Sequence, residues 1–163
     1  MNTSVAGRAL VEPDFEPVLA ELDSRSAVLY LHPAGNGACS PLIGNYHLTW
    51  TIGAPVEDTI SVIQLITHGI PARYPGIKII NSHLGGALPM LLGRADDQLR
   101  LEAPETPELP SVAARRMWYD TVGHGHVPAL RVRDRLLGGG PAATGNRLPL
   151  RERGRLPARG RLH

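Results

Sequence analysis

The stretch Ile77-Lys78-Ile79-Ile80-Asn81-Ser82-His83-Leu84-Gly85-Gly86 decides the fold. Its first four residues are mostly β-branched, which is typical of a buried strand. A polar cluster with one histidine follows, and then two glycines that let the backbone approach a ligand closely. In α/β folds, chemistry is placed at the carboxyl ends of strands. His83 is therefore a candidate site residue, and the alternative is a histidine that caps the strand and bonds to a neighbouring loop.

A second histidine follows an earlier apolar run in the same way. Residues 27–31 predict another buried strand, and His32 comes directly after it. Because the carboxyl ends of parallel strands meet at one edge, we expect His32 and His83 to end neighbouring strands with their rings facing one cavity. Neutral imidazoles in that position can bind a divalent metal or move a proton. Two ordinary loop histidines are the alternative.

The segments around these strands have the apolar spacing of helices. Strands and helices that alternate in this way imply βαβ units and a parallel sheet, and so an α/β fold. In the helix that follows the glycines, we expect Met90, Leu91 and Leu92 to face inward. The predicted helices cover residues 13–22, 55–67, 87–101 and a segment from 127, and the predicted strands cover 27–31, 77–80 and 117–121.

The composition is that of a globular protein in a reducing compartment. The chain has 163 residues, enough for one domain with a core. A single cysteine, Cys39, excludes an internal disulfide and a cysteine zinc cluster. No stretch approaches the roughly 20 apolar residues of a membrane span, and residues 1–8 lack the regions of a signal peptide. We therefore expect a cytoplasmic protein with no membrane partner.

The charge changes sharply near Leu130. Residues 131–163 hold nine arginines and two acidic residues, a net charge of +7, whereas the rest of the chain carries −5. The arginines alternate with Leu, Pro, Gly and Ala, a pattern that cannot bury a face. We predict a domain over 1–130 and a disordered basic tail over 131–163. The tail has no aromatic residues among its arginines, which argues against nucleic acid as its partner.

Several motifs, taken together and in this order, resemble the amidohydrolase-related family. Members of that family include aminocarboxymuconate semialdehyde decarboxylase and the resorcylate decarboxylases. The resemblance spans roughly residues 2–130, and no single motif would carry it alone. The motifs are Leu31-His32-Pro33, Asp58-Thr59, residues 73–80, Ser82-His83-Leu84-Gly85-Gly86, Arg94 and Tyr119-Asp120-Thr121.

This resemblance implies a fold, a metal and a reaction. It implies part of a TIM (β/α) barrel with a divalent metal, zinc or manganese, at the carboxyl face of the strands. It maps a metal ligand onto His32 and a catalytic proton-transfer residue onto His83. The implied parent activity is decarboxylation of a small aromatic or unsaturated carboxylate substrate. Hydrolysis by the same apparatus is one alternative, and a non-enzymatic fragment whose basic tail binds an acidic partner is another.

The chain departs from the family pattern at the metal ligands. No His-x-His pair precedes His32, and no Asp-Tyr-Pro follows Leu130. Three of the four ligands that the resemblance implies are therefore absent, as is much of the roughly 250 residues of a full barrel. Because a catalytic zinc normally takes three protein ligands, we expect this chain alone to be inactive. Open strand edges favour assembly, either as a homo-oligomer or with a chain that supplies the missing strands.

The basic tail has a further explanation in its coding sequence. We predict that the segment after about Leu130 is translated out of the family's reading frame. Codons that encode residues 146–153 can be chosen so that a start one nucleotide later reads Thr-Asp-Tyr-Pro-Tyr-Glu-Asn. That peptide contains the Asp-Tyr-Pro motif of the family. If the prediction is correct, residues 131–163 should be disordered or poorly packed, with no strand that completes the sheet.

Overall fold

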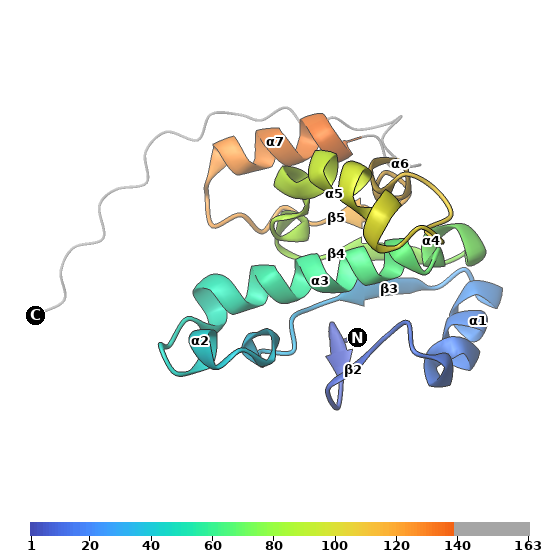
Figure 1. Ribbon diagram of the computed structural model, residues 1–163, viewed down its shortest axis with the longest axis horizontal. Coiled ribbons are helices and arrows are strands. Elements are labelled where there is room, and N and C mark those ends of the chain that lie inside the picture. The colour runs from blue at the N-terminus through green and yellow to red at the C-terminus, as the bar shows by residue number, and fades with distance from the viewer. Residues whose placement is uncertain (139–163) are drawn as a thin grey trace, which may run out of the picture.

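The structure is a computed structural model, and it describes residues 1–138 (Figure 1). A short antiparallel hairpin comes first, and helices then alternate with parallel strands. In chain order the elements are β1 (Ser4–Val5), β2 (Arg8–Ala9), a 3-10 turn (Pro13–Phe15), α1 (Glu16–Ser24), β3 (Val28–Leu31), a 3-10 turn (Gly37–Cys39), α2 (Pro41–Gly44), a π-helical turn (Thr49–Gly53), α3 (Ala54–Thr67), α4 (Ile70–Arg73), β4 (Lys78–Asn81), a 3-10 turn (His83–Gly85), α5 (Leu88–Glu102), α6 (Pro110–Ala114), β5 (Trp118–Tyr119) and α7 (Val127–Leu137).

The central sheet is parallel, as the alternation of strands and helices predicts. Within residues 1–138 its strand order is β3-β4-β5, with Leu31 opposite Asn81 and Asn81 opposite Tyr119. The N-terminal segment extends the free edge of β3, because the backbone N–H of His32 donates to the carbonyl of Met1 at 3.1 Å. Because β3 and β4 pair in parallel, their carboxyl ends lie side by side at one edge of the sheet.

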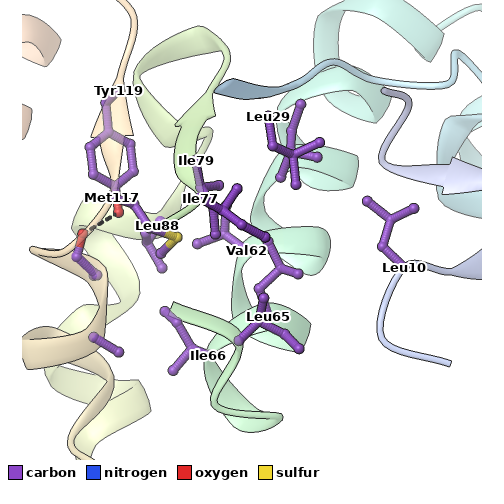
Figure 2. Packing of buried hydrophobic residues seen from close by; sticks show 14 of the residues in the cluster. Leu10, Leu29, Val62, Leu65, Ile66, Ile77, Ile79, Leu88, Met117 and Tyr119 are labelled. Carbon is purple, nitrogen blue, oxygen red and sulfur yellow. Dashed lines mark hydrogen bonds between the residues drawn. The ribbon is translucent and has the colours of Figure 1, made fainter. Parts of the chain in front are cut away.

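The core lies between one face of this sheet and the helices. Figure 2 shows Ile77 and Ile79 of the β4 segment between the apolar side chains of α3 and those of Leu88 and Met117. Full burial of each large apolar side chain contributes about 1.5–3 kcal/mol. This packing fixes the position of α3 relative to the strands, and Figure 1 shows α3 running alongside β3. The α3 residues in the core include Val62, Leu65 and Ile66.

The other face of the sheet is open in residues 1–138. Leu29 and Leu31 are buried, but Val28 is 58% exposed and Tyr30 is 38% exposed. Lys78 of β4 is exposed as well. The prediction of fully buried strands is therefore wrong for alternate residues, because helices cover only one face and successive side chains point to opposite faces.

The long helices follow their predicted ranges, with some differences in detail. In α5, Leu92 is buried as expected, but Met90 is 75% exposed and Leu91 is exposed too. Three consecutive helical residues span about 200° of arc at 3.6 residues per turn, so they cannot all face one core. The hairpin and the short helices α2, α4 and α6 were not predicted from the sequence. Within residues 1–138 no helix combines the length and the apolarity that a membrane crossing requires.

Helix α7 crosses the boundary that the charge pattern predicts near Leu130. The helix continues to Leu137, which is 2% exposed and belongs to the core, and Leu136 packs against that core. The expectation of poor packing from residue 131 onward is therefore wrong for 131–137, because this segment keeps apolar residues at helical spacing among its arginines. The same expectation for residues 139–163, and the predicted absence of a strand there, lie outside the described residues.

Candidate active site at the ends of β3 and β4

The two predicted histidines lie together at the carboxyl edge of the sheet. His32 directly follows β3, and His83 lies two residues after the end of β4. Their ring centroids are 5.6 Å apart, and the ring planes are tilted by 57°. The predicted juxtaposition on neighbouring parallel strands is thus confirmed, and the shared cavity stays a prediction. At this separation one small ligand can contact both rings.

The ring of His83 is held by a carboxylate from α3. Its Nδ1 atom lies 2.8 Å from Oδ2 of Asp58, and the hydroxyl of Ser82 donates to Oδ1 of Asp58 at 2.8 Å. The side chain of Asp58 is 1% exposed, whereas that of His83 is 24% exposed. Asp58 therefore anchors the buried side of the ring and leaves the other side accessible.

The buried position of Asp58 has an electrostatic cost. Burial raises the pKa of the Asp58 carboxyl above its ordinary value, because a charge is disfavoured away from water. The hydrogen bonds from His83 and Ser82 lower that pKa and offset only part of the effect. A carboxylate is thus kept in an unfavourable environment next to the histidine.

The backbone at His83 is strained and is anchored by a second carboxylate. His83 and Leu84 have φ angles of 48° and 61°, in the left-handed region that residues other than glycine rarely adopt. Oδ1 of Asp120, which follows β5, accepts the backbone N–H of Leu84 at 3.2 Å and that of Val122 at 3.0 Å. Oδ2 of the same carboxylate accepts the hydroxyl of Tyr30 at 2.7 Å. Asp120 thereby fixes the turn that presents His83.

These contacts shift the pKa values of Asp120 and Tyr30 in opposite directions. Burial by itself would raise the pKa of Asp120, but hydrogen bonds from Tyr30, Val122 and Leu84 outweigh it and hold that pKa below its ordinary value. The same hydrogen bond, together with burial, raises the pKa of Tyr30 to about 12. The pair is therefore a phenol that donates to a carboxylate at neutral pH.

The glycines after His83 serve the packing of this turn against α3. Gly86 has a φ of 64°, and a Cβ atom placed on it would lie 2.2 Å from the carbonyl oxygen of Pro55. The backbone N–H of Ala87 donates to the hydroxyl of Thr59 at 2.8 Å. We predicted that the glycines let the backbone approach a ligand. At Gly86 this prediction is wrong, because Gly86 approaches the backbone of the first turn of α3.

The loop after His32 is held by the residue next to Asp58. Glu57 is buried, and its carboxylate accepts the backbone N–H groups of Ala34 at 2.7 Å and Gly35 at 3.1 Å. The N–H of Ala38 and the hydroxyl of Thr3 also donate to it, at 3.4 and 3.3 Å. Consecutive carboxylates of α3 therefore organise the two strand ends.

The chemistry of the His32 ring is compatible with metal binding. Nδ1 of His32 lies 3.1 Å from the carbonyl oxygen of Pro33, so a proton on Nδ1 leaves Nε2 free for a ligand. Among residues 1–138, however, no group of three or more His, Cys, Asp or Glu side chains is arranged to hold a metal ion. A catalytic zinc takes three protein ligands. The residues described here therefore do not form a complete metal site.

Sequence reasoning missed the carboxylates that support the histidines. Asp58 and Asp120 both occur in the motifs that carry the family resemblance, yet no local pattern assigned them a role. One available signal was the pair Glu57-Asp58 in the first turns of a helix whose later residues are apolar. Two adjacent acidic residues beside a core-facing stripe indicate that at least one of them has a partner elsewhere in the fold.

Comparisons with known proteins identify the relatives of this chain. No family model matches it. It is 38% identical to 6-methylsalicylic acid decarboxylase of Penicillium expansum over 111 residues, 66% of this chain and 34% of that protein. It is 26% identical to 2-amino-3-carboxymuconate-6-semialdehyde decarboxylase of Dictyostelium discoideum over 128 residues, 76% and 35% of the two chains. The chain is related to the amidohydrolase-type decarboxylases.

Solved structures agree with this relationship. 5-Carboxyvanillate decarboxylase of Novosphingobium aromaticivorans, with bound manganese and 3-methoxy-4-hydroxy-5-nitrobenzoic acid, superposes with a TM-score of 0.77 at 26% identity. The match covers 85% of this chain and 43% of that enzyme. The predicted resemblance to amidohydrolase-type decarboxylases and the expectation of a divalent metal among them are confirmed, with manganese as the metal observed. The chain spans about a third of the length of its curated decarboxylase relatives.

Proposed function

We propose that this chain carries part of the active site of a metal-dependent decarboxylase for a small aromatic carboxylate. The observation that carries the proposal is the pair of histidine rings, 5.6 Å apart, at the ends of neighbouring parallel strands. This pair lies in a chain that superposes on a decarboxylase whose structure contains manganese and a substituted benzoic acid. Decarboxylation is favoured over hydrolysis because the curated relatives are decarboxylases.

The two histidines have different proposed roles. His32 would be one ligand of the divalent metal, which acts as a Lewis acid when it is bound. His83 would transfer the proton. As the bond between the ring carbon and the carboxylate breaks, its electron pair stays on that carbon, CO2 leaves, and the proton on Nε2 of His83 moves to the carbon. His83 ends this step as a neutral imidazole.

The open sheet face supports a partial TIM barrel as the architecture. In such a barrel, alternate strand residues face the helices and the barrel interior. Leu29 and Leu31 face the helices, so Val28 and Tyr30 would face the interior beside the site. The remaining strands and metal ligands of such a barrel would lie outside residues 1–138. The single cysteine is compatible with the cytoplasm as the place of action.

Binding and turnover of labelled substrate test the proposal. The purified chain is mixed with Mn²⁺ and carboxyl-labelled 6-methylsalicylate, and binding and released CO2 are measured separately. We expect Mn²⁺-dependent binding that His32→Ala and His83→Ala weaken at least tenfold, with little CO2 released because the metal site is incomplete. His47→Ala, which changes an exposed histidine, is the matched control.

The possible outcomes separate the proposal from its rival. CO2 release that His83→Ala abolishes would confirm the reaction and overturn only the expectation that this chain alone is inactive. Binding that neither substitution changes, or no binding of any hydroxybenzoate, would contradict the proposed site. Binding of an acidic polymer in place of the carboxylate would favour the non-enzymatic alternative.

A further inference from the structure

We propose that Asp58 is a positioning residue that fixes His83 as its Nδ1-protonated tautomer and so leaves Nε2 as the nitrogen that exchanges protons with a ligand. The inference rests on the proposed function, because it concerns the histidine assigned to proton transfer. It adds a residue on α3 whose effect on the reaction is exerted through His83.

The hydrogen-bond inventory around Asp58 determines where the proton lies. An ionised carboxylate only accepts hydrogen bonds. Oδ1 of Asp58 receives the hydroxyl of Ser82, and Oδ2 receives Nδ1 of His83, each at 2.8 Å. Nδ1 must then carry a hydrogen, and a neutral ring with a hydrogen on Nδ1 has its lone pair on Nε2. The reverse assignment requires a protonated Asp58 that donates to Nδ1.

The two ring nitrogens of His83 have different surroundings. The Asp58 side chain is buried, whereas His83 keeps a quarter of its side-chain surface exposed. The ring of His32 lies on this edge of the sheet, 5.6 Å away. Nδ1 is therefore committed to Asp58, whereas Nε2 is neither buried nor hydrogen-bonded within residues 1–138 and is the nitrogen left for a ligand.

The environment of Asp58 argues for a role beyond stability. A buried carboxylate costs free energy, and here burial outweighs the favourable hydrogen bonds, so the pKa of Asp58 is raised. An uncharged asparagine would fit the same space without that cost. A buried carboxylate with a perturbed pKa that holds the ring of a candidate proton donor is typical of a functional site.

Nitrogen-15 NMR of the histidine rings tests the proposal on the purified chain. The spectrum is recorded at increasing alkaline pH until the ring signals stop changing, so that the neutral ring is observed. His83→Gln identifies the His83 signals among the seven histidines. We expect Nδ1 to resonate as a protonated ring nitrogen and Nε2 as an unprotonated one.

Two variants separate positioning from packing. Asp58→Ala should remove the preference for a hydrogen on Nδ1. Ser82→Ala, which deletes the other donor to Asp58, is the matched control and should leave the His83 tautomer unchanged. A wild-type ring with its hydrogen on Nε2 would overturn the proposal without any variant, and so would an unchanged tautomer in folded Asp58→Ala.

A further variant distinguishes the positioning role from a structural one. Asp58→Asn should leave the melting temperature unchanged or raise it, yet weaken the tautomer preference, because a carbonyl oxygen accepts less strongly than a carboxylate. A large fall in melting temperature with an unchanged tautomer would show a structural role and overturn the proposal. None of these readouts requires turnover, so a failed decarboxylation assay and a failed tautomer test remain distinct results.

Discussion

The strand ends that carry His32 and His83 are held by neighbouring residues of one helix, but in different ways. Glu57 accepts hydrogen bonds from the backbone N–H groups of the loop after His32 and forms none with the ring. Asp58 binds the ring of His83 directly. The ring of His32 has its nearest polar partner in the adjacent residue, the carbonyl of Pro33.

This difference matches the work proposed for each ring. A metal ligand needs an accessible Nε2 atom and a well-positioned loop behind it. The hydrogen bonds of Glu57 to the loop backbone hold that loop in position. A proton donor needs a defined tautomer and a steady orientation, and the ring clamp of Asp58 supplies both. Removal of Glu57 should therefore affect folding most, whereas removal of the Asp58 charge should affect the chemistry of His83.

The largest expected effect comes from Glu57→Ala. The substitution leaves the partly buried N–H groups of Ala34 and Gly35 without their acceptor, and an unsatisfied group costs about 1–3 kcal/mol when it is fully buried. We expect the free energy of unfolding to fall by about 3 kcal/mol, measured by urea denaturation. Glu105→Ala changes an exposed carboxylate and is the control. A loss below about 1 kcal/mol would show that these hydrogen bonds contribute little.

A smaller loss is expected from Gly86→Ala at the other strand end. The added Cβ meets the carbonyl of Pro55 and must adopt a left-handed φ, which costs about 2 kcal/mol. The control is Gly93→Ala in α5, where nothing beyond the helix's own neighbouring backbone lies within 4 Å of the added Cβ and helix propensity predicts a gain of about 1 kcal/mol. The melting temperatures of both variants are measured. Equal changes in the two would contradict the close packing of Gly86 against α3.

The smallest expected effects are opposite pH slopes for two aspartates. Asp58 has a raised pKa, so its favourable contribution is complete below the unfolded value of about 3.9 and is lost as pH rises through the folded value. Asp120 has a lowered pKa, so its contribution is present above about 3.9 and is lost as pH falls through the folded value.

Neutral variants expose these slopes. As pH rises from about 2 to about 6, the stability of Asp58→Asn relative to wild type should increase, and that of Asp120→Asn should decrease. Denaturant melts at several pH values give both slopes. If the stability of both variants changed with pH in the same direction, the two carboxylates would have similar environments. That result would contradict the contrast between Asp58, which is costly to ionise, and Asp120, which stabilises the fold when ionised.

The sequence predicted the parts of this site that depend on local pattern. A run of β-branched residues followed by a histidine appears twice, and it correctly placed His32 and His83 on adjacent strand ends. The roles of Glu57 and Asp58 depend on which strand end each carboxylate reaches across the fold. Residues 34 and 83 lie 23 and 25 positions from their carboxylate partners, so no local window contains both members of either pair.

In the fold, too, the features set by local pattern were predicted and those set by distant neighbours were not. Helix α3 was predicted almost to the residue because its apolar stripe is continuous. Residues 131–137 were misjudged because composition drew attention to their arginines, while Leu136 and Leu137 pack on the core. Only the three-dimensional arrangement of neighbours decides whether such a short apolar pair is buried. The open face of β3 was also beyond the sequence, since alternate burial depends on which elements cover the sheet.

Mn²⁺ titration followed by the histidine ring spectrum tests the central claim, that His32 and His83 form one site, most directly. Paramagnetic broadening depends steeply on distance, and even weak binding suffices. We expect the signals of His32 and His83 to broaden together at the lowest Mn²⁺ concentrations, and His32→Ala to remove the effect on His83. Broadening of any other histidine first, or of His83 alone in the absence of His32, would contradict it.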